Sequence, residues 1–233
     1  MRRHWKRWLV GGIVLLVALV VGGPFAYFHF IEGTSPKRLT LSSQTSTTGA
    51  GAGTAAASSA PLAGTWSVTN GSQAGYRVDE VLFGQSHTAV GRTSAVTGKV
   101  TFSGTTVSAG TLSVDLTQVS SDQDRRDRQF QGRIMDTSSY PTATFTLTQP
   151  IDLGTAPAAG VQKNVSAKGN LTIHGATRAV TVQLQARRDG NVVQVSGSIP
   201  VTFADWNIPN PSFGPVTTDD HGVIEFLLKL TPA

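Results

Sequence analysis

The sequence contains no cysteine. This absence excludes disulfide bonds, zinc–thiolate sites, iron–sulfur clusters and thiol-based catalysis, and it also excludes a lipid anchor attached to cysteine. Packing alone must then stabilise the folded part of the chain. Residues 64–233 are 170 of the 233 residues, a length that buries roughly 70% of the surface of the unfolded chain.

The globular part of the chain also lacks net charge. The whole sequence has a formal charge of +5, but residues 1–63 hold six Lys or Arg and a single Glu. The remaining residues therefore hold thirteen cations and thirteen acids, so that the excess belongs to the N-terminal segment alone. A nucleic-acid-binding surface needs a clustered basic excess, and we predict no nucleic-acid partner.

The only long hydrophobic run lies near the N-terminus. Residues 9–31 carry no formal charge and, as a helix, would span ~35 Å, enough for a hydrocarbon core of ~30 Å. Four cations precede this run within residues 1–8, so the flanking charges predict a basic cytoplasmic stub, a single-pass transmembrane helix over 9–31 and a domain outside the membrane.

A cleavable signal peptide is the alternative interpretation of the same run. Signal peptidase needs small residues at the cleavage site, whereas the run ends with Pro24, Phe25, Tyr27 and Phe28. We therefore favour an uncleaved anchor in the cell membrane; cleavage of residues 1–31 would release the domain. Both interpretations place the domain outside the cytoplasm.

Residues 32–63 are mostly Ser, Thr, Gly and Ala. This composition has too few apolar side chains to offset the entropy of ordering. It predicts a flexible linker whose ends are roughly 30 Å apart, which connects the membrane segment to a domain over 64–233.

Within that domain, apolar residues recur with a period of two, the period of half-buried strands. The alternating segments are 96–102, 112–116, 143–147, 171–173, 180–184, 193–201 and 224–230. Asp189-Gly190 between two of them favours a tight hairpin turn. The pattern predicts an all-β domain of about eight strands.

Two architectures fit such strands, a β-sandwich and a closed antiparallel β-barrel. The strands reach about ten residues, which favours the barrel. An eight-stranded barrel is either filled by its own side chains or wide enough for one small ligand. Residues 121–132 are rich in helix formers and predict one short helix, placed at the rim or mouth.

Motifs for catalysis, cofactors and metals are scarce. Gly84–Thr88 resembles the start of a nucleophile elbow but lacks its second glycine. Asp219, Asp220 and His221 form the tightest group of metal-type ligands, yet neighbouring residues of a strand point to opposite faces. We therefore predict no metal site, no cofactor and no catalytic residue.

Several short sequence motifs of the domain occur in the order in which they occur in a known protein family. They are Tyr76-Arg77-Val78-Asp79, Arg126-Asp127 followed by Phe130, Tyr140-Pro141 leading to Phe145, and Gly169-Asn170-Leu171-Thr172-Ile173-His174-Gly175. On these residues the domain resembles the YceI-like family of lipocalin-like barrels, which is associated with polyisoprenoid binding. Many relatives have a histidine where this chain has Leu82-Phe83-Gly84.

The resemblance implies non-catalytic binding or carriage of an isoprenoid or isoprenoid-quinone-like lipid inside the barrel. Burial of each CH₂ group contributes ~0.8 kcal/mol, so an apolar interior suits such a ligand. The expected lining residues are Tyr76, Val78, Phe102, Leu112, Val114, Phe130, Phe145, Leu147, Leu171, Ile173, Val182, Leu184, Trp206, Phe213 and Phe226. Protein partners are not predicted.

Two other functions make different predictions about the barrel interior. A structural or interaction module of the cell envelope needs no cavity, so large aromatic side chains would plug the barrel. A barrel-type enzyme, the third hypothesis, needs a polar cluster in which His87 or His174 faces a carboxylate.

Overall fold

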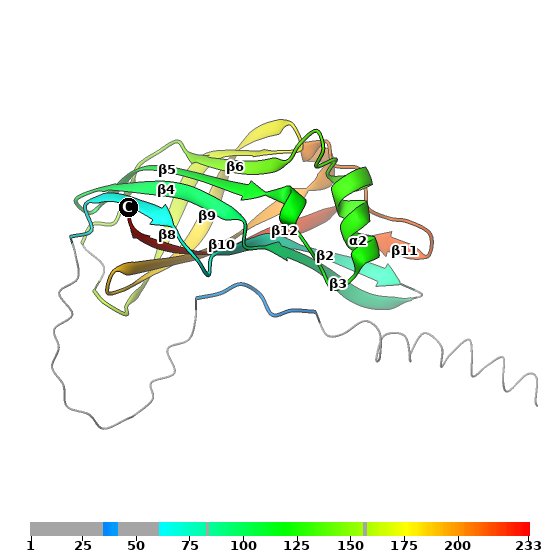
Figure 1. Ribbon diagram of the computed structural model, residues 1–233, viewed down its shortest axis with the longest axis horizontal. Coiled ribbons are helices and arrows are strands. Elements are labelled where there is room, and N and C mark those ends of the chain that lie inside the picture. The colour runs from blue at the N-terminus through cyan, green and yellow to red at the C-terminus, as the bar shows by residue number, and fades with distance from the viewer. Residues whose placement is uncertain (1–34, 42–60, 83, 156–157) are drawn as a thin grey trace, which may run out of the picture.

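The computed structural model describes residues 35–41, 61–82, 84–155 and 158–233 (Figure 1). The predicted cytoplasmic stub, the predicted membrane span and most of the predicted linker lie outside these ranges. Within them, no helix has the length and apolarity needed to cross a membrane.

Twelve strands form one sheet that curls into a barrel. They are β1 (Gly64–Val68), β2 (Gln73–Leu82), β3 (Gln85–Thr93), β4 (Val96–Ser103), β5 (Thr106–Asp115), β6 (Thr142–Leu147), β7 (Ile151–Asp152), β8 (Gln162–Ile173), β9 (Ala176–Asp189), β10 (Val192–Thr202), β11 (Val216–Thr218) and β12 (His221–Pro232). The strand pairs are antiparallel.

Eight strands close the ring in the order β1-β4-β5-β6-β8-β9-β10-β12, and β12 pairs back with β1. Towards the other end of β12, β2 takes the place of β1, and β3 pairs with β2. The all-β, closed antiparallel barrel is thus confirmed. Each alternating segment of the sequence lies in one of these strands, except that Leu116 at the end of segment 112–116 begins a 3₁₀ turn.

Two-residue turns set the register of the long hairpins. β9 and β10 are joined by Gly190-Asn191, and Asp189 pairs with Val192 across the turn. β8 and β9 are joined by His174-Gly175, both at positive φ (+47° and +74°). Such turns match the right-handed twist of the strands, so the hairpin predicted at Asp189-Gly190 is confirmed.

The predicted short helix is also present, with slightly different bounds. α2 spans Asp124–Gln129 and continues as a π-helical turn over Phe130–Ile134. Two 3₁₀ turns, Leu116–Gln118 and Phe203–Trp206, complete the helical segments among the described residues. α2 lies across one end of the barrel, which we call the mouth (Figure 1).

The opposite end is closed by side chains. Trp66 is 1% exposed and donates a hydrogen bond from its ring nitrogen to the carbonyl of Leu62 (2.9 Å). The ring of Phe102 meets Trp66 edge-on at 5.9 Å between centroids, and the guanidinium of Arg188 lies 5.5 Å from the centre of the Trp66 ring. These contacts form a floor beneath the barrel interior.

The outer wall carries a buried ionic cluster. Glu225 on β12 is only 2% exposed, although its neighbours Ile224 and Phe226 face the interior. Its carboxylate lies 2.7 Å from Nη2 of Arg92 and 3.4 Å from Nε of Arg77. A buried charge persists only where it is paired, and these two arginines from β3 and β2 supply the pairing.

Residues 35–41 cover this cluster from outside and differ from the flexible linker expected there. The two arginines donate to the carbonyls of Pro36 (2.5 Å, from Arg77) and Lys37 (from Arg92). The amide of Leu39 lies 3.4 Å from the Glu225 carboxylate, and Leu41 is 8% exposed. We call residues 35–41 the strap.

Candidate functional site

The barrel is hollow. Its inner cavity has a volume of about 190 Å³ and lies above the floor formed around Trp66. Its walls are almost entirely apolar, because the inward positions of the strands carry the Val, Leu, Ile and Phe residues of the period-two pattern. Leu62, Val107 and Leu153 line its lower part.

A second, outer cavity of about 430 Å³ lies at the mouth beneath α2. Its apolar lining includes Tyr76, Phe130, Ile134 and Phe203. Polar side chains also line it, among them Glu80, Gln123, Arg125, Arg126 and Gln129. The outer cavity therefore has both an apolar body and a polar border, whereas the inner one is apolar.

The two cavities follow one another along the barrel. Ala74, Val114, Ala143 and Ile224 line both of them. The outer volume alone falls within the ~300–1,000 Å³ typical of small-molecule sites. An elongated ligand with an apolar tail and a polar head fits these two adjoining cavities, with the head at the mouth.

Small residues leave room for the aromatic rings that line the interior. Tyr76 pairs with Gly91 across β2 and β3, and Phe226 pairs with Gly197 across β12 and β10. A Cβ atom at Gly91 would lie 2.4 Å from the Tyr76 ring, and one at Gly197 would lie 2.7 Å from Phe226. These rings therefore lie against the wall, not across the barrel axis.

Tyr76 is the polar-tipped aromatic residue of the outer cavity. Its ring stacks on Phe130 of the π-helical turn, with centroids 5.0 Å apart and planes at 13°. Burial raises the pKa of the Tyr76 phenol well above its usual value. The phenol thus stays protonated and is able to donate a hydrogen bond to a ligand's head group.

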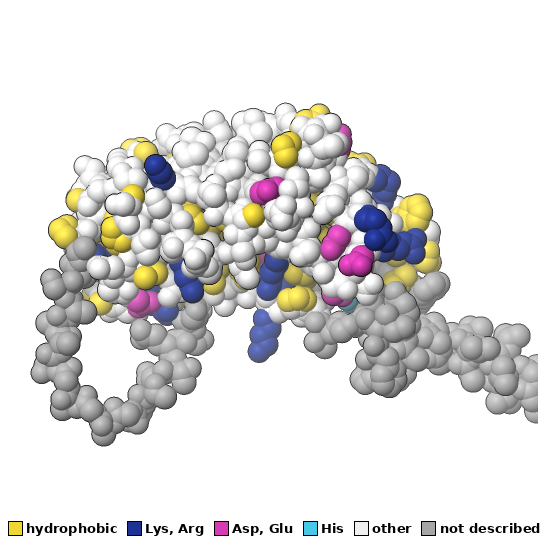
Figure 2. All heavy atoms as spheres, in the orientation of Figure 1, with side chains coloured by type: hydrophobic (Ala, Val, Ile, Leu, Met, Phe, Trp, Pro, Cys, Tyr) yellow, Lys and Arg dark blue, Asp and Glu magenta, His cyan; other side chains and the backbone are white. Residues whose placement is uncertain are grey.

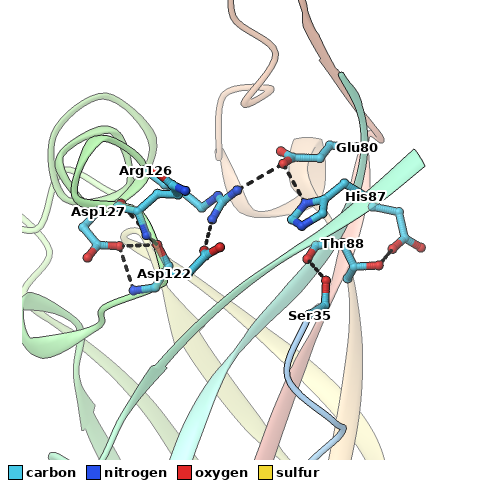
Figure 3. A network of polar contacts seen from close by, with 10 residues as sticks. Ser35, Glu80, His87, Thr88, Asp122, Arg126 and Asp127 are labelled. Atoms are coloured by element: carbon cyan, nitrogen blue, oxygen red, sulfur yellow. Dashed lines mark hydrogen bonds and ion pairs between the residues drawn. The ribbon is translucent and has the colours of Figure 1, made fainter. Parts of the chain in front are cut away.

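A polar network fixes α2 over the mouth (Figure 3). Glu80 on β2 lies 3.3 Å from Nδ1 of His87 on β3 and 3.3 Å from Nη2 of Arg126 on α2, which also pairs with Asp122. Asp127 accepts hydrogen bonds from the amide (2.8 Å) and hydroxyl (2.6 Å) of Ser121. The network holds helix and strands together at the cavity border.

The structure brings most of the predicted lining residues together. Phe102, Leu112, Phe145, Leu147, Leu171, Val182, Leu184 and Phe226 line the inner cavity, Tyr76, Val78, Phe130, Ile173 and Phe213 line the outer one, and Val114 lines both. Their role in ligand binding stays a prediction.

Trp206 is the exception. It is buried, at 4% exposed, but it lies in neither lining. It belongs to the 3₁₀ turn Phe203–Trp206 and to the hydrophobic cluster around Phe130 and Met135. A residue in such a turn follows no period-two rule, so the strand pattern gives no direction for its side chain.

Sequence reasoning missed the polar border and part of the floor. Glu80 follows the Tyr76–Asp79 motif and Gln123 lies within the predicted helix 121–132, but nothing in the sequence shows that they meet at one opening. Leu62 and Leu153 are single apolar residues outside the alternating segments. Only the closure of the barrel brings them under the inner cavity.

The remaining candidate groups lie away from the cavities. His221 is exposed, and its Nδ1 lies 2.8 Å from Asp220; this hydrogen bond raises the pKa of the histidine. Among the described residues, no three His, Cys, Asp or Glu side chains form a group that could hold a metal ion. His174 lies in the β8–β9 turn, its ring 4.8 Å from that of Tyr140.

Comparisons with known families agree with this architecture. A family model described as YceI-like domain matches residues 66–230, which includes nearly the whole barrel. No curated protein matches the chain.

Solved structures provide a second comparison. A polyisoprenoid-binding domain from Saccharophagus degradans, implicated in plant cell wall breakdown, is similar with a TM-score of 0.60 and 19% identity, over 72% of this chain and 98% of that domain. BcnA of Burkholderia cenocepacia is 24% identical, over 66% of this chain and 95% of its own, with a TM-score of 0.48. At these identities the likeness to the first domain shows the fold alone.

Proposed function

The chain belongs to the family of proteins with a YceI-like domain, and from this premise we propose that its barrel binds an isoprenoid or isoprenoid-quinone-like lipid without catalysis. The isoprenoid tail occupies the inner cavity, and the head group lies in the outer cavity near Tyr76. The Saccharophagus degradans domain, which has the same fold, is described as polyisoprenoid-binding.

The apolar inner cavity, which adjoins the polar-bordered outer cavity through shared lining residues, is the observation that carries this proposal. One five-carbon isoprene unit contributes on the order of 3 kcal/mol when buried, at ~0.8 kcal/mol per CH₂ group. Several units exceed the entropy cost of association. The protonated Tyr76 phenol and the polar border supply hydrogen-bonding groups where the head would lie.

The N-terminal segment places this barrel at a membrane in our proposal. Residues 9–31 form a single-pass anchor, the N-terminus stays cytoplasmic, and the barrel works outside. The length and charge flanks of the run support this orientation. An anchored barrel stays near the bilayer, which is where its ligand dissolves.

The two other functions explain the interior less well. A purely structural module has no use for cavities of about 190 and 430 Å³. The 3.3 Å pair of His87 and Glu80 is the feature that an enzyme would need. However, the same Glu80 oxygen also binds Arg126, and His87 is not among the lining residues, so the pair is better explained as a support for α2.

Native extraction of the full chain from its host, followed by mass spectrometry of bound lipid, tests the proposal. We expect about one isoprenoid lipid per chain, and none with an unrelated membrane protein extracted in parallel. A His87→Gln variant should retain the lipid. Chains without any co-extracted lipid would contradict lipid binding. If the wild-type chain converts its lipid to a product and the His87→Gln variant does not, the enzyme hypothesis is favoured.

A further inference from the structure

The border of the mouth combines an exposed aromatic side chain with cations. Phe213, in the loop before β11, is 50% exposed. The guanidinium groups of Arg125 on α2 and Arg133 on the π-helical turn each lie 5.7 Å from the centre of its ring. Figure 2 shows apolar, basic and acidic side chains gathered at this end of the molecule. We call these three residues the rim.

The two rim arginines differ from Arg126 in what they bind. Arg126 is paired with Glu80 and Asp122, whereas Arg133 donates to the backbone carbonyls of Asn210 (3.3 Å) and Pro211 (2.7 Å). Among the described residues, neither rim arginine has a carboxylate within ion-pair distance. Their charge is available to an anionic partner.

The strap gives an independent indication of what faces this rim. The hydroxyl of Ser35 donates to the carbonyl of Thr88 (2.7 Å), beside His87 at the mouth (Figure 3). From there the strap runs over Arg77 and Arg92 towards Leu41, away from the mouth (Figure 1). Ser35, the first residue of the strap, therefore lies at the mouth end.

The strap also shortens the distance between the barrel and the predicted membrane span. Only residues 32–34 separate Ser35 from that span. Three extended residues reach about 10 Å, compared with roughly 30 Å between the ends of a free linker over residues 32–63. A docked strap thus keeps the mouth, not the floor, close to the bilayer.

From these two observations we propose that the rim docks on the anionic phospholipid surface of the bilayer and that the strap directs it there. Phe213 enters the interfacial region, where aromatic side chains are favoured, and the two arginines bind phosphate groups. The inference rests on the proposed function, since docking at the mouth gives a membrane lipid a path into the outer cavity without passing through water.

The cysteine-free sequence makes the orientation measurable. We would introduce single cysteines at Thr217 on β11 by the mouth and at Ser103 at the end of β4 by the floor, both exposed. Each full-length variant carries a fluorophore in vesicles of phosphatidylcholine with or without phosphatidylglycerol, and head-group spin-labelled lipid quenches it. We expect several-fold stronger quenching at T217C than at S103C, increased by the anionic lipid.

Variants separate the contributions of the rim and the strap. Each of Arg125→Gln and Arg133→Gln should weaken docking about fivefold, since an interfacial cation contributes ~1 kcal/mol on an anionic surface. Phe213→Ser should reduce quenching at T217C. Val161→Ser, at an apolar residue that is 56% exposed near the floor, is the matched control and should have no effect. Leu41→Asp should release the strap, so that T217C and S103C are quenched to the same extent.

Equal quenching of T217C and S103C, stronger quenching at S103C, or no association with vesicles would each overturn the inference. The lipid content of the same preparations is measured separately by mass spectrometry. If the preparations contain bound lipid but T217C and S103C are quenched equally, docking is refuted and the proposed function is not. If the preparations contain no bound lipid but T217C is quenched more strongly than S103C, the proposed function is refuted and docking is not.

Discussion

At the scale of single residues, the hollow depends on glycines that face aromatic rings. An alanine has a Cβ where Gly197 has none, and that atom would lie 2.7 Å from Phe226 and 3.0 Å from Leu184. Both of these neighbours line the inner cavity. Gly110 lines the same cavity, but a Cβ there would meet no atom closer than 3.7 Å.

Gly197→Ala should therefore push Phe226 towards the barrel axis. We expect the free energy of unfolding to fall by about 1–3 kcal/mol, the usual effect of overpacking, and the bound lipid per chain to decrease. Gly110→Ala is the matched control and should change neither quantity by much. Urea denaturation and mass spectrometry provide the two readouts. If both variants change the free energy of unfolding and the bound lipid to a similar extent, the Phe226 ring can move without entering the cavity.

At the scale of elements, two-residue turns determine which face of each strand points inward. A slip of one residue moves every side chain of a strand to the opposite face. The β8–β9 turn controls the longest pairing, from Gln162↔Arg187 to Ile173↔Ala176. His174 occupies its first position at φ +47°, a conformation that asparagine tolerates and β-branched residues avoid.

His174→Val should lower the free energy of unfolding by about 1–2 kcal/mol because a β-branched residue is strained at this φ. His174→Asn removes the same ring contact with Tyr140 but keeps the backbone conformation, so it should be much less destabilising. Denaturation midpoints at constant m-value measure the difference. Equal losses in both variants would assign the effect to the ring contact.

The strands were predictable because their outward residues are polar. Thr, Ser and Lys alternate with Val and Phe along β4, and the period alone gives the inward face. β3 was harder to predict: its apolar Ala89 and Val90 are adjacent, and Gly91 follows. Its placement comes from pairing with β2, a tertiary effect that no local pattern contains.

The strap shows the same limit more clearly. Leu39 and Leu41 alternate with polar residues, a short signal within a segment whose composition favours disorder. Its order comes from Arg77, Arg92 and Glu225, which are distant in sequence. An acidic residue in the apolar run of β12 was the other available clue, because a buried carboxylate requires cations nearby.

At the scale of the whole molecule, barrel closure turns separate strand faces into one elongated hollow. The sequence predicted which strand residues face inward, but not that the interior divides into an apolar inner part and a polar-bordered outer part. That division depends on α2 and on the floor around Trp66, which lie at opposite ends. Under the proposed function, a tail must pass the junction between the two parts to reach the inner cavity.

Ala143 on β6 lines both cavities and marks this junction. Ala143→Phe should narrow the passage, so that long-chain isoprenoids bind less well while short-chain ones still occupy the outer cavity. Ala179→Phe, at an exposed position of β9, is the control and should keep the wild-type chain lengths. Mass spectrometry of lipids retained from a mixture of defined lengths gives the answer. An unchanged length distribution in Ala143→Phe would mean that the tail does not pass the junction.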